Sequence, residues 1–211
     1  MPFPVPITDL DDLRSRYRPL SDLVRRKEID RIDGAARSFI ERSPFVVVAT
    51  GGPDGCDASP RGGPPGFVKV LDDHRLVLGD LAGNNRLDTY ANVVASPPVG
   101  LLFLVPGVEE TLRVNGRGTP TADPDILDAA VIDGRRPKVA LGVDVDGCYI
   151  HCGKALRRSS LWETDSWPAP GDRPSAACIL RDHVELDVEP EVIERAIEND
   201  YRATLWETGG V

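Results

Sequence analysis

Residues 57–80 read DASPRGGPPGFVKVLDDHRLVLGD, and this stretch decides the fold. Its first part is predicted to pair, as a hairpin, with the preceding β-branched run PFVVVATGG, which ends in the turn sequence GGPDG. Its second part, GFVKVLDDHRLVLGD, is predicted to form another hairpin with DDH at the tip. Between the two stands an arginine beside two glycines and two prolines. A bound anion would explain a cation held on backbone with almost no side chains.

The rest of the middle region continues this β pattern. The apolar run VGLLFLVPG suits a strand buried on both faces, whereas ETLRVNGRGTPTA and KVALGVDVDGCYIHC alternate between apolar and polar residues. The helices expected between strands, in GNNRLDTYANVVAS and DPDILDAAVIDG, are short. We therefore expect a mainly β protein with flanking helices, an antiparallel barrel of about six strands rather than a doubly wound sheet.

Both ends of the chain are expected to be helical. The N-terminal segment 1–43 offers Thr8 as a helix N-cap, and the barrel domain is predicted over 44–163, with the helix GKALRRSSLW packed outside it. Residues 164–211 are predicted to be a Pro-rich surface linker, SWPAPGDRPSAA, followed by an amphipathic C-terminal helix.

Composition excludes several classes of function. The 211 residues are 41% hydrophobic and 28% charged, as in globular proteins, and a formal net charge of −9 spread along the chain argues against a nucleic-acid partner. No apolar run reaches the roughly 18 residues of a membrane span, so no membrane association is expected. The N-terminus lacks the basic start and apolar stretch of a signal peptide, which predicts a cytoplasmic protein.

The four cysteines are too few and too scattered for a disulfide framework. The segment CYIHC has neither the residue order of a c-type haem motif nor a second ligand pair for zinc, so no metal site is expected. We expect buried or half-buried thiols, with His151 on the opposite strand face from Cys148 and Cys152. No residue stands out as a general acid or nucleophile.

An anion site is predicted first at the segment SPRGG. Arg61 is a bidentate cation, Ser59 is a side-chain donor, and the backbone N–H groups around Gly62 and Gly63 are open to a ligand because glycine has no side chain.

A second segment of the same site is GDLAGNNRLD. A strand ends here and a helix is expected to begin at Asn84 or Asn85, so that free N–H groups and the positive helix end point outward. Arg86 then lies in the first helical turn, where a cation is unfavourable against the helix dipole unless an anion is bound.

A third segment, ETLRVNGR, presents Thr111, Arg113 and Asn115 on the exposed face of a strand. Taken singly, each arginine has an alternative interpretation as a solvated residue or as a partner of the abundant acids. The joint pattern favours a small-anion site.

Together these motifs resemble those of the pyridoxamine 5′-phosphate oxidase-like flavoproteins, the FMN-binding split β-barrels, over about residues 40–163. Arg61 and Lys69 match the family's Arg-to-Lys strand, DDHRL matches its hairpin, and Asn84-Asn85-Arg86 matches its helix opening. Residues 111–116, TLRVNG, match a Gln-x-Arg-x-x-Gly pattern. More narrowly, SPRGGPPGFVKV, GNNRLDTYANV, GLLFLVPGVEETLRVNGR and YIHCGKALRRSSLW are similar to a bacterial subgroup.

The resemblance implies FMN at a homodimer interface. It implies that the 5′-phosphate is held by Arg61, Asn84, Asn85 and Arg86. It places the isoalloxazine edge along Ser59, Pro60, Arg61 and Gly62, and along Gly79 and Asp80. Thr111 and Arg113 would reach the flavin from the second subunit. The implied activity is that of an FMN-dependent oxidoreductase moving hydride to or from a small substrate.

The sequence also departs from the oxidase itself. The oxidase's substrate anchors have no counterpart after residue 120, and its C-terminal Trp-and-Arg flavin contact is missing, so pyridoxamine phosphate is not the expected substrate. Trp162 or Arg157 could substitute for that contact. Two alternatives stay open: a barrel that binds deazaflavin F420 or haem, and a non-catalytic flavin-binding protein, which the missing acid and base residues favour.

Overall fold

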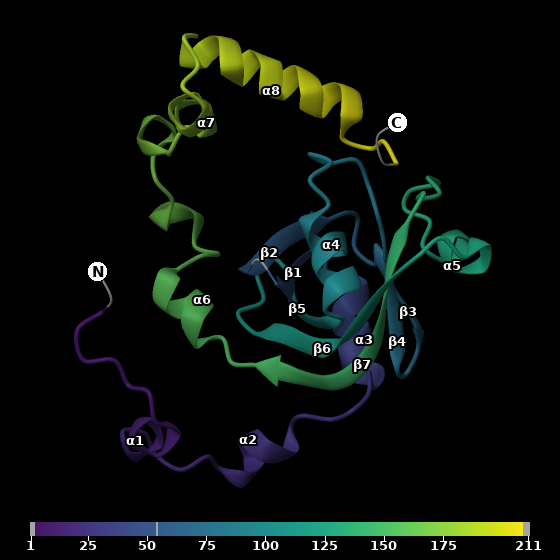
Figure 1. The fold of residues 1–211 in the computed structure, drawn as a ribbon, viewed down its shortest axis with the longest axis vertical. Coiled ribbons are helices and arrows are strands. Elements are labelled where there is room, and N and C mark those ends of the chain that lie inside the picture. Colours follow the sequence, from purple (N-terminus) through teal and green to yellow (C-terminus); the bar gives the residue numbers. More distant parts are fainter. Residues whose placement is uncertain (1–2, 54, 209–211) are drawn as a thin grey trace.

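A computed structural model describes residues 3–53 and 55–208 (Figure 1). Its seven strands form one antiparallel sheet in the order β2-β1-β5-β6-β7-β4-β3. The strands are β1 (Phe45–Gly52), β2 (Gly55–Gly62), β3 (Val68–Asp72), β4 (Arg75–Gly79), β5 (Pro98–Leu104), β6 (Thr111–Thr121) and β7 (Ala140–His151).

The sheet curls as a split barrel does but stays open, because its two end strands, β2 and β3, are not paired with each other. The predicted mainly β, antiparallel architecture with flanking helices is confirmed, with seven strands in place of about six.

The two hairpins that include residues 57–80 lie where the sequence predicts them. Strands β1 and β2 pair from Phe45↔Gly62 to Gly52↔Gly55, and β3 pairs with β4. The predicted first turn includes residue 54, which lies outside the described residues. Strand β2 runs through Arg61 to Gly62, so the backbone leaves the sheet after the arginine and not before it.

The core lies inside the curl of the sheet. Its buried side chains come from alternate positions of the strands, such as Val46, Val48 and Phe103, and from helices α3 (Gly34–Arg42) and α4 (Asp88–Ala95), which supply Ile40 and Val93. The prediction that the apolar run VGLLFLVPG, which contains most of β5, is buried on both faces is wrong. On its outer face, Gly100, Leu102 and Leu104 of β5 are only half-buried and Pro98 is exposed.

The remaining helices flank or stand off the sheet. They are α1 (Leu10–Ser15), α2 (Asp22–Arg26), α5 (Pro124–Ala129), α6 (Lys154–Ser159), α7 (Ala176–Val184) and α8 (Pro190–Thr204). Two short 3₁₀ helices, Thr164–Ser166 and Pro170–Asp172, lie in the predicted linker. The N-cap of α1 is Asp9 and not Thr8, because the Asp9 carboxylate accepts a hydrogen bond of 2.8 Å from the Asp12 amide. The boundaries of the predicted domains stay a prediction.

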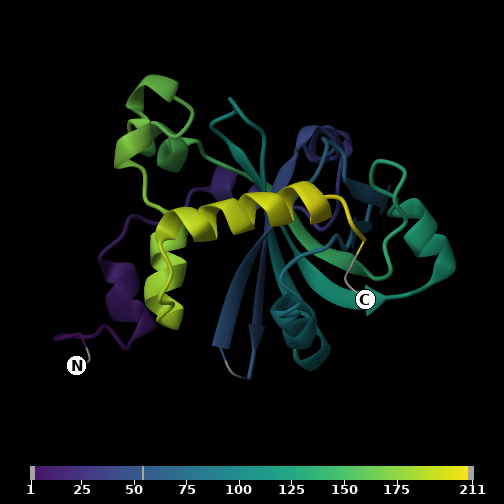
Figure 2. The same cartoon turned by 90° about the horizontal axis from the view of Figure 1, so that it is seen from above.

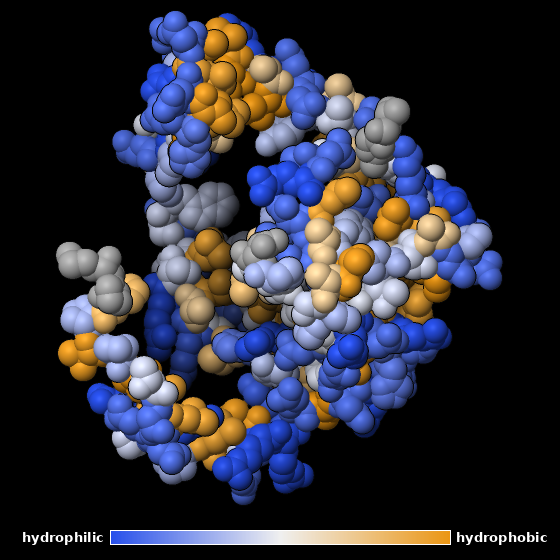
Figure 3. Space-filling view, viewed as in Figure 1, coloured by the Kyte–Doolittle hydropathy of each residue, from blue (hydrophilic) through white to orange (hydrophobic). Residues whose placement is uncertain are grey.

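The terminal helices expose much apolar surface. Neither α1 nor α2 has a buried residue, and Figure 3 shows apolar side chains gathered over α1 and α2 and over α7 and α8. Figure 2 shows α8 as a straight helix leading from α7 to the C-terminal end of the chain. Among the described helices, none is both long and apolar enough to cross a bilayer.

The cysteine expectation holds only in part. Cys148 is buried and Cys178 half-buried, but Cys56 and Cys152 are exposed. Cys56 lies on the edge strand β2, and Cys152 lies just past the end of β7. The described residues contain no group of His, Cys, Asp and Glu that could hold a metal ion.

Candidate functional site

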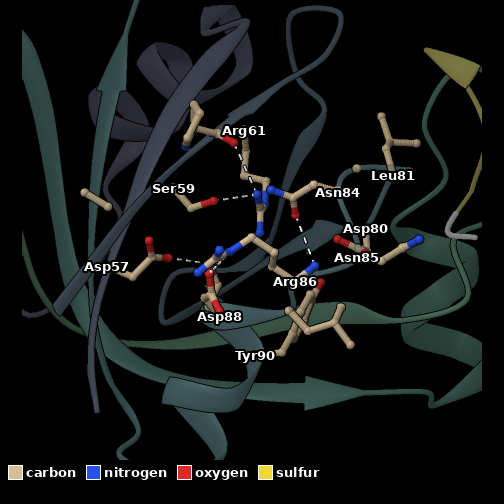
Figure 4. Close-up of a pocket in the computed structure, with 15 residues that line it drawn as sticks. Asp57, Ser59, Arg61, Asp80, Leu81, Asn84, Asn85, Arg86, Asp88 and Tyr90 are labelled. Atoms are coloured by element: carbon tan, nitrogen blue, oxygen red, sulfur yellow. Dashed lines mark hydrogen bonds and ion pairs between the residues drawn. The ribbon is translucent and has the colours of Figure 1, made fainter. Parts of the chain in front are cut away.

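A cavity of about 380 Å³ opens between β2, the loop after β4, and the start of α4 (Figure 4). We call it the polar cavity. It brings together seven of the residues predicted from sequence: Ser59, Pro60, Arg61, Asp80, Asn84, Asn85 and Arg86. The first two of the three predicted segments, SPRGG and GDLAGNNRLD, therefore face one another.

Arg61 is anchored on the wall that β2 provides. Its guanidinium donates a hydrogen bond of 2.7 Å to the Ser59 hydroxyl and one of 3.4 Å to the hydroxyl of Thr89, in α4. The Thr89 hydroxyl in turn donates to Asp57 at 3.0 Å. Because side chains alternate along a strand, Asp57, Ser59 and Arg61 share the face of β2 that meets α4. This short chain of bonds fixes the cation before any ligand arrives.

The loop before α4 corrects one prediction. The helix begins at Asp88, not at Asn84 or Asn85, and both Asn85 (φ 57°) and Leu87 (φ 59°) have left-handed backbone that turns the chain into the helix. Arg86 therefore precedes the first turn, and its Nε lies 2.7 Å from the Asp88 carboxylate. The prediction that Arg86 lies in the first helical turn and opposes the helix dipole is therefore wrong. Arg86 precedes the helix, and the first residue of that turn is the acid Asp88.

The first turn of α4 still offers donors to the cavity. No described side chain caps this turn, so its leading N–H groups have no partner within the helix. Asp88, Thr89 and Tyr90, the first three residues of α4, all line the cavity.

Asp80 and Tyr90 form a half-buried pair in the same cavity. Burial raises the pKa of the Asp80 carboxyl, and the nearby Arg61 and a hydrogen bond from the Tyr90 hydroxyl oppose that rise only in part. Burial, together with the negative charge of Asp80, raises the pKa of Tyr90 as well. Tyr90 is thus a neutral donor, and Asp80 holds a proton more readily than an exposed aspartate does.

A second cavity, of about 480 Å³, adjoins the first and shares Pro60, Arg61, Leu81 and Gly83 with it. It also includes Gly62 and Gly79, two of the residues that the resemblance assigns to the edge of a flavin ring. We call it the tail cavity, because Leu205 and Trp206, which follow α8, form part of its wall.

Thr111 and Arg113 do not reach either cavity within one chain. They line a third cavity, of about 390 Å³, on the outer face of the sheet, together with half-buried residues of β1 and β5. We call it the outer-face cavity. His151 and Cys152 both line it, so the prediction that they face opposite ways is wrong, because β7 ends at His151 and Cys152 no longer follows the strand alternation.

Several lining residues were missed by sequence reasoning. Asp57 could have been found, since it stands two and four residues before Ser59 and Arg61 on the same strand face. Thr89 and Tyr90 follow directly from the corrected start of α4. Leu205 and Trp206 carry no local signal, because their place depends on where a distant helix ends.

Solved structures with a similar chain path include three bacterial proteins. HupZ of Group A Streptococcus is 16% identical over 56% of this chain and 93% of its own, with a TM-score of 0.46. A pyridoxamine 5′-phosphate oxidase-like protein of Lactobacillus delbrueckii is 19% identical over 57% and 95%, with a TM-score of 0.42. An FMN-binding protein of Syntrophomonas wolfei is 12% identical over 56% and 84%, with a TM-score of 0.42.

A comparison with curated proteins finds no match. The sequence model of the pyridoxamine 5′-phosphate oxidase family, in contrast, matches residues 32–152, more than half of the chain. The matched region contains all seven strands, helix α4 and the polar cavity, and leaves out α8 and the residues after it. The chain therefore belongs to the pyridoxamine 5′-phosphate oxidase family.

Proposed function

We propose that this protein binds FMN, with the 5′-phosphate in the polar cavity and the ring system toward the tail cavity, and that it acts as a homodimeric oxidoreductase. The observation that carries the proposal is the convergence of Arg61, from an edge strand, with the loop Asn84–Arg86 and the uncapped start of α4 around one cavity. Membership of the family supports the choice of FMN.

The donors of the polar cavity match a phosphate group. A phosphate monoester carries close to two negative charges near neutral pH and accepts several charge-assisted hydrogen bonds. The guanidinium groups of Arg61 and Arg86 and the free N–H groups of the first turn of α4 supply such bonds. The hydroxyl of Ser59 and the amides of Asn84 and Asn85 add neutral donors.

Carboxylates already pair with some of these donors. Asp88 holds Arg86, and Asp57 accepts from Thr89. In the complex we expect the phosphate to take the place of Asp88 as the partner of Arg86. Since the Arg86 side chain is 71% exposed, this exchange costs little.

Bound FMN would supply the ability to take up and release a hydride, and the chain binds and orients the reactants. Glycine backbone at Gly62 and Gly79 allows a flat ring to approach the main chain. The half-buried pair of Asp80 and Tyr90 lines the polar cavity next to Leu81, which both cavities share. The substrate we infer is a small molecule.

Thr111 and Arg113 enter this proposal through a second subunit. They lie on the opposite sheet face from the polar cavity, so they can contribute to a flavin only if two chains associate through that face. The half-buried apolar residues around them suit such a contact.

The test is an absorbance scan of the purified protein, with FMN added if the protein is colourless. A flavin spectrum retained through desalting supports the proposal, and a protein that takes up no FMN contradicts it. A haem or deazaflavin spectrum would instead assign the same fold to another cofactor. Reduction of the bound flavin by a nicotinamide donor separates an oxidoreductase from a flavin-binding protein without catalysis.

The phosphate assignment is tested with Arg86→Ala, which we expect to weaken FMN binding about tenfold or more, because a charge-assisted hydrogen bond is lost. Arg16→Ala is the matched control: Arg16, which directly follows α1, also pairs with a surface aspartate, Asp12, and it lines none of the three cavities. Unchanged affinity in Arg86→Ala would remove Arg86 from the site.

A further inference from the structure

The outer wall of the tail cavity is built by residues that lie beyond the family region. Leu205 and Trp206 line it, whereas the family match ends at residue 152. Helix α8 ends at Thr204, and Figures 1 and 2 show the chain turning back toward the barrel after it. We call Leu205–Thr208 the tail.

Two contacts from different elements hold the tail in this place. The backbone N–H of Ala82, in the loop that separates the two cavities, donates a hydrogen bond of 2.7 Å to the carbonyl of Glu207. The Arg135 guanidinium, from the segment between α5 and β7, lies 5.7 Å from the centre of the Trp206 ring, within the range of a cation–π contact. Residue Trp206 is still 38% exposed, so part of its surface remains accessible to a ligand.

The chemistry of the cavity restricts what fits. Among the described residues that line it, Arg61 is the one charged side chain, and the rest are apolar side chains or glycine backbone. At Gly83 the cavity wall is open backbone, because nothing lies within 4 Å of the position that a Cβ would occupy there. Phe67, Leu81, Leu205 and Trp206 therefore offer apolar surface, and Arg61 offers a donor at one side.

We propose that Leu205 and Trp206 are ligand-binding residues, and that the tail cavity takes a flat, mainly apolar ring system whose carbonyl or anionic edge faces Arg61. With FMN as the ligand, this rests on the proposed function and adds to it that the tail covers the ring and selects flat reaction partners. Aromatic contact with the Trp206 ring supplies the affinity.

The experiment uses the full chain and two probes, FMN and lumiflavin, which is the flavin ring without the ribityl phosphate. Binding is followed by flavin fluorescence, and exposure of the bound ring by iodide quenching. We expect Trp206→Ala to weaken both probes by the same factor, about tenfold, and to increase iodide quenching. Trp206→Phe should restore most of the affinity. Trp167→Ala is the control, since Trp167 is also exposed and lines none of the three cavities.

The outcomes separate this proposal from the proposed function. FMN binding and iodide quenching that Trp206→Ala and Leu205→Ala leave unchanged would overturn the role of the tail and leave the FMN site standing. Lumiflavin binding that is lost in Trp206→Ala, in a protein that does not bind FMN, would support the tail and overturn the phosphate site. A wild-type protein that binds neither probe overturns both.

Discussion

Arg86 and Asp88 form an exposed ion pair at the polar cavity, and such a pair adds little to stability. The pair matters for binding, because the Asp88 carboxylate and the FMN phosphate would compete for the same Arg86 guanidinium. An unliganded site that keeps its cation paired holds the side chain near its working position. The net charge of the polar cavity therefore depends on the ionisation of its carboxylates, those of Asp57, Asp80 and Asp88.

Asp88→Asn is predicted to tighten FMN binding by roughly three- to tenfold, because it removes a negative charge beside the phosphate and frees Arg86. The measurement is an FMN titration followed by fluorescence. Riboflavin, which has no phosphate, should show no such gain. Asp12→Asn, which breaks a similar surface pair in α1, is the control. A loss of FMN affinity in Asp88→Asn would place the phosphate elsewhere.

Asp80 gives a prediction for pH. Burial raises its pKa in the folded state above the ordinary aspartate value of 3.8, so the folded protein binds this proton more readily than the unfolded chain does. Its favourable contribution to stability is therefore complete below pH 3.8 and is lost as the pH rises through the raised pKa. Asp80→Asn, which cannot ionise, should be more stable than wild type at pH 7.

The check is urea unfolding of both proteins at neutral and at acid pH. The difference between them should shrink as the pH falls toward 3.8, the value for an ordinary aspartate. Asp11→Asn, at an exposed position of α1, controls for the loss of one charge. A variant whose free energy of unfolding matches wild type at every pH would show that burial of Asp80 has no energetic consequence.

At the scale of elements, β6 and β7 are the two longest strands of the sheet. They pair with each other and approach closely at a register shift between Asn115 and Gly116. A Cβ at Gly116 would lie 2.1 Å from the carbonyl oxygen of Asp144, and backbone cannot move away as a flexible side chain can. This glycine is required by the contact between the two strands.

Gly116→Ala is predicted to lower the free energy of unfolding by about 2 kcal/mol or more, because the strands must separate to admit the methyl group. Gly100→Ala is the matched control: Gly100 lies in β5, and its added Cβ would have no neighbour closer than 3.6 Å. The measurement is urea unfolding, which gives the free energy of unfolding of both variants. Equal stabilities would show that the bulge absorbs the extra atom.

The elements also show what the sequence could predict. Strand β6 was found because Leu112 and Val114 alternate with polar residues, and period two is a strong local signal. The start of α4 was placed too early, because Asn85 and Leu87 adopt left-handed backbone, which no polarity pattern reveals. The outer face of β5 was misread because its apolar residues predict burial, whereas they are only half-buried in the described chain.

The same limit applies to the site. Arg61 and the Asn84–Arg86 loop could be predicted, since a cation on glycine-rich backbone and a donor-rich loop are local features. The tail could not, because it depends on a contact between Ala82 and Glu207, which the length and direction of α8 bring about.

At the scale of the whole molecule, the outer face of the sheet and the terminal helices both expose apolar surface. Each chain carries a formal net charge of −9, so two copies repel and their association must rest on apolar contact. The dimer that we propose would associate through the outer face, because a partner there also brings Arg113 toward a second subunit.

Sedimentation is therefore predicted to show a dimer of 22.9 kDa chains that higher salt does not dissociate. Leu102→Asp, on the half-buried outer face of β5, should yield monomers, because an unpaired charge would be buried in the contact. Leu23→Asp, in the exposed helix α2, should remain dimeric. Monomeric wild type, or dissociation by the α2 variant alone, would contradict this interface.

The open edge of the sheet has a further consequence, for self-association into filaments. An unpaired edge strand is a template for adding strands from other molecules, and β2 is such an edge. Pro60 interrupts its row of N–H groups, and the glycines and prolines that follow turn the chain away from the sheet. At the opposite edge, β3 has a register irregularity between Val70 and Asp72. The residues that leave backbone bare for a ligand thus also make this sheet a poor seed for amyloid.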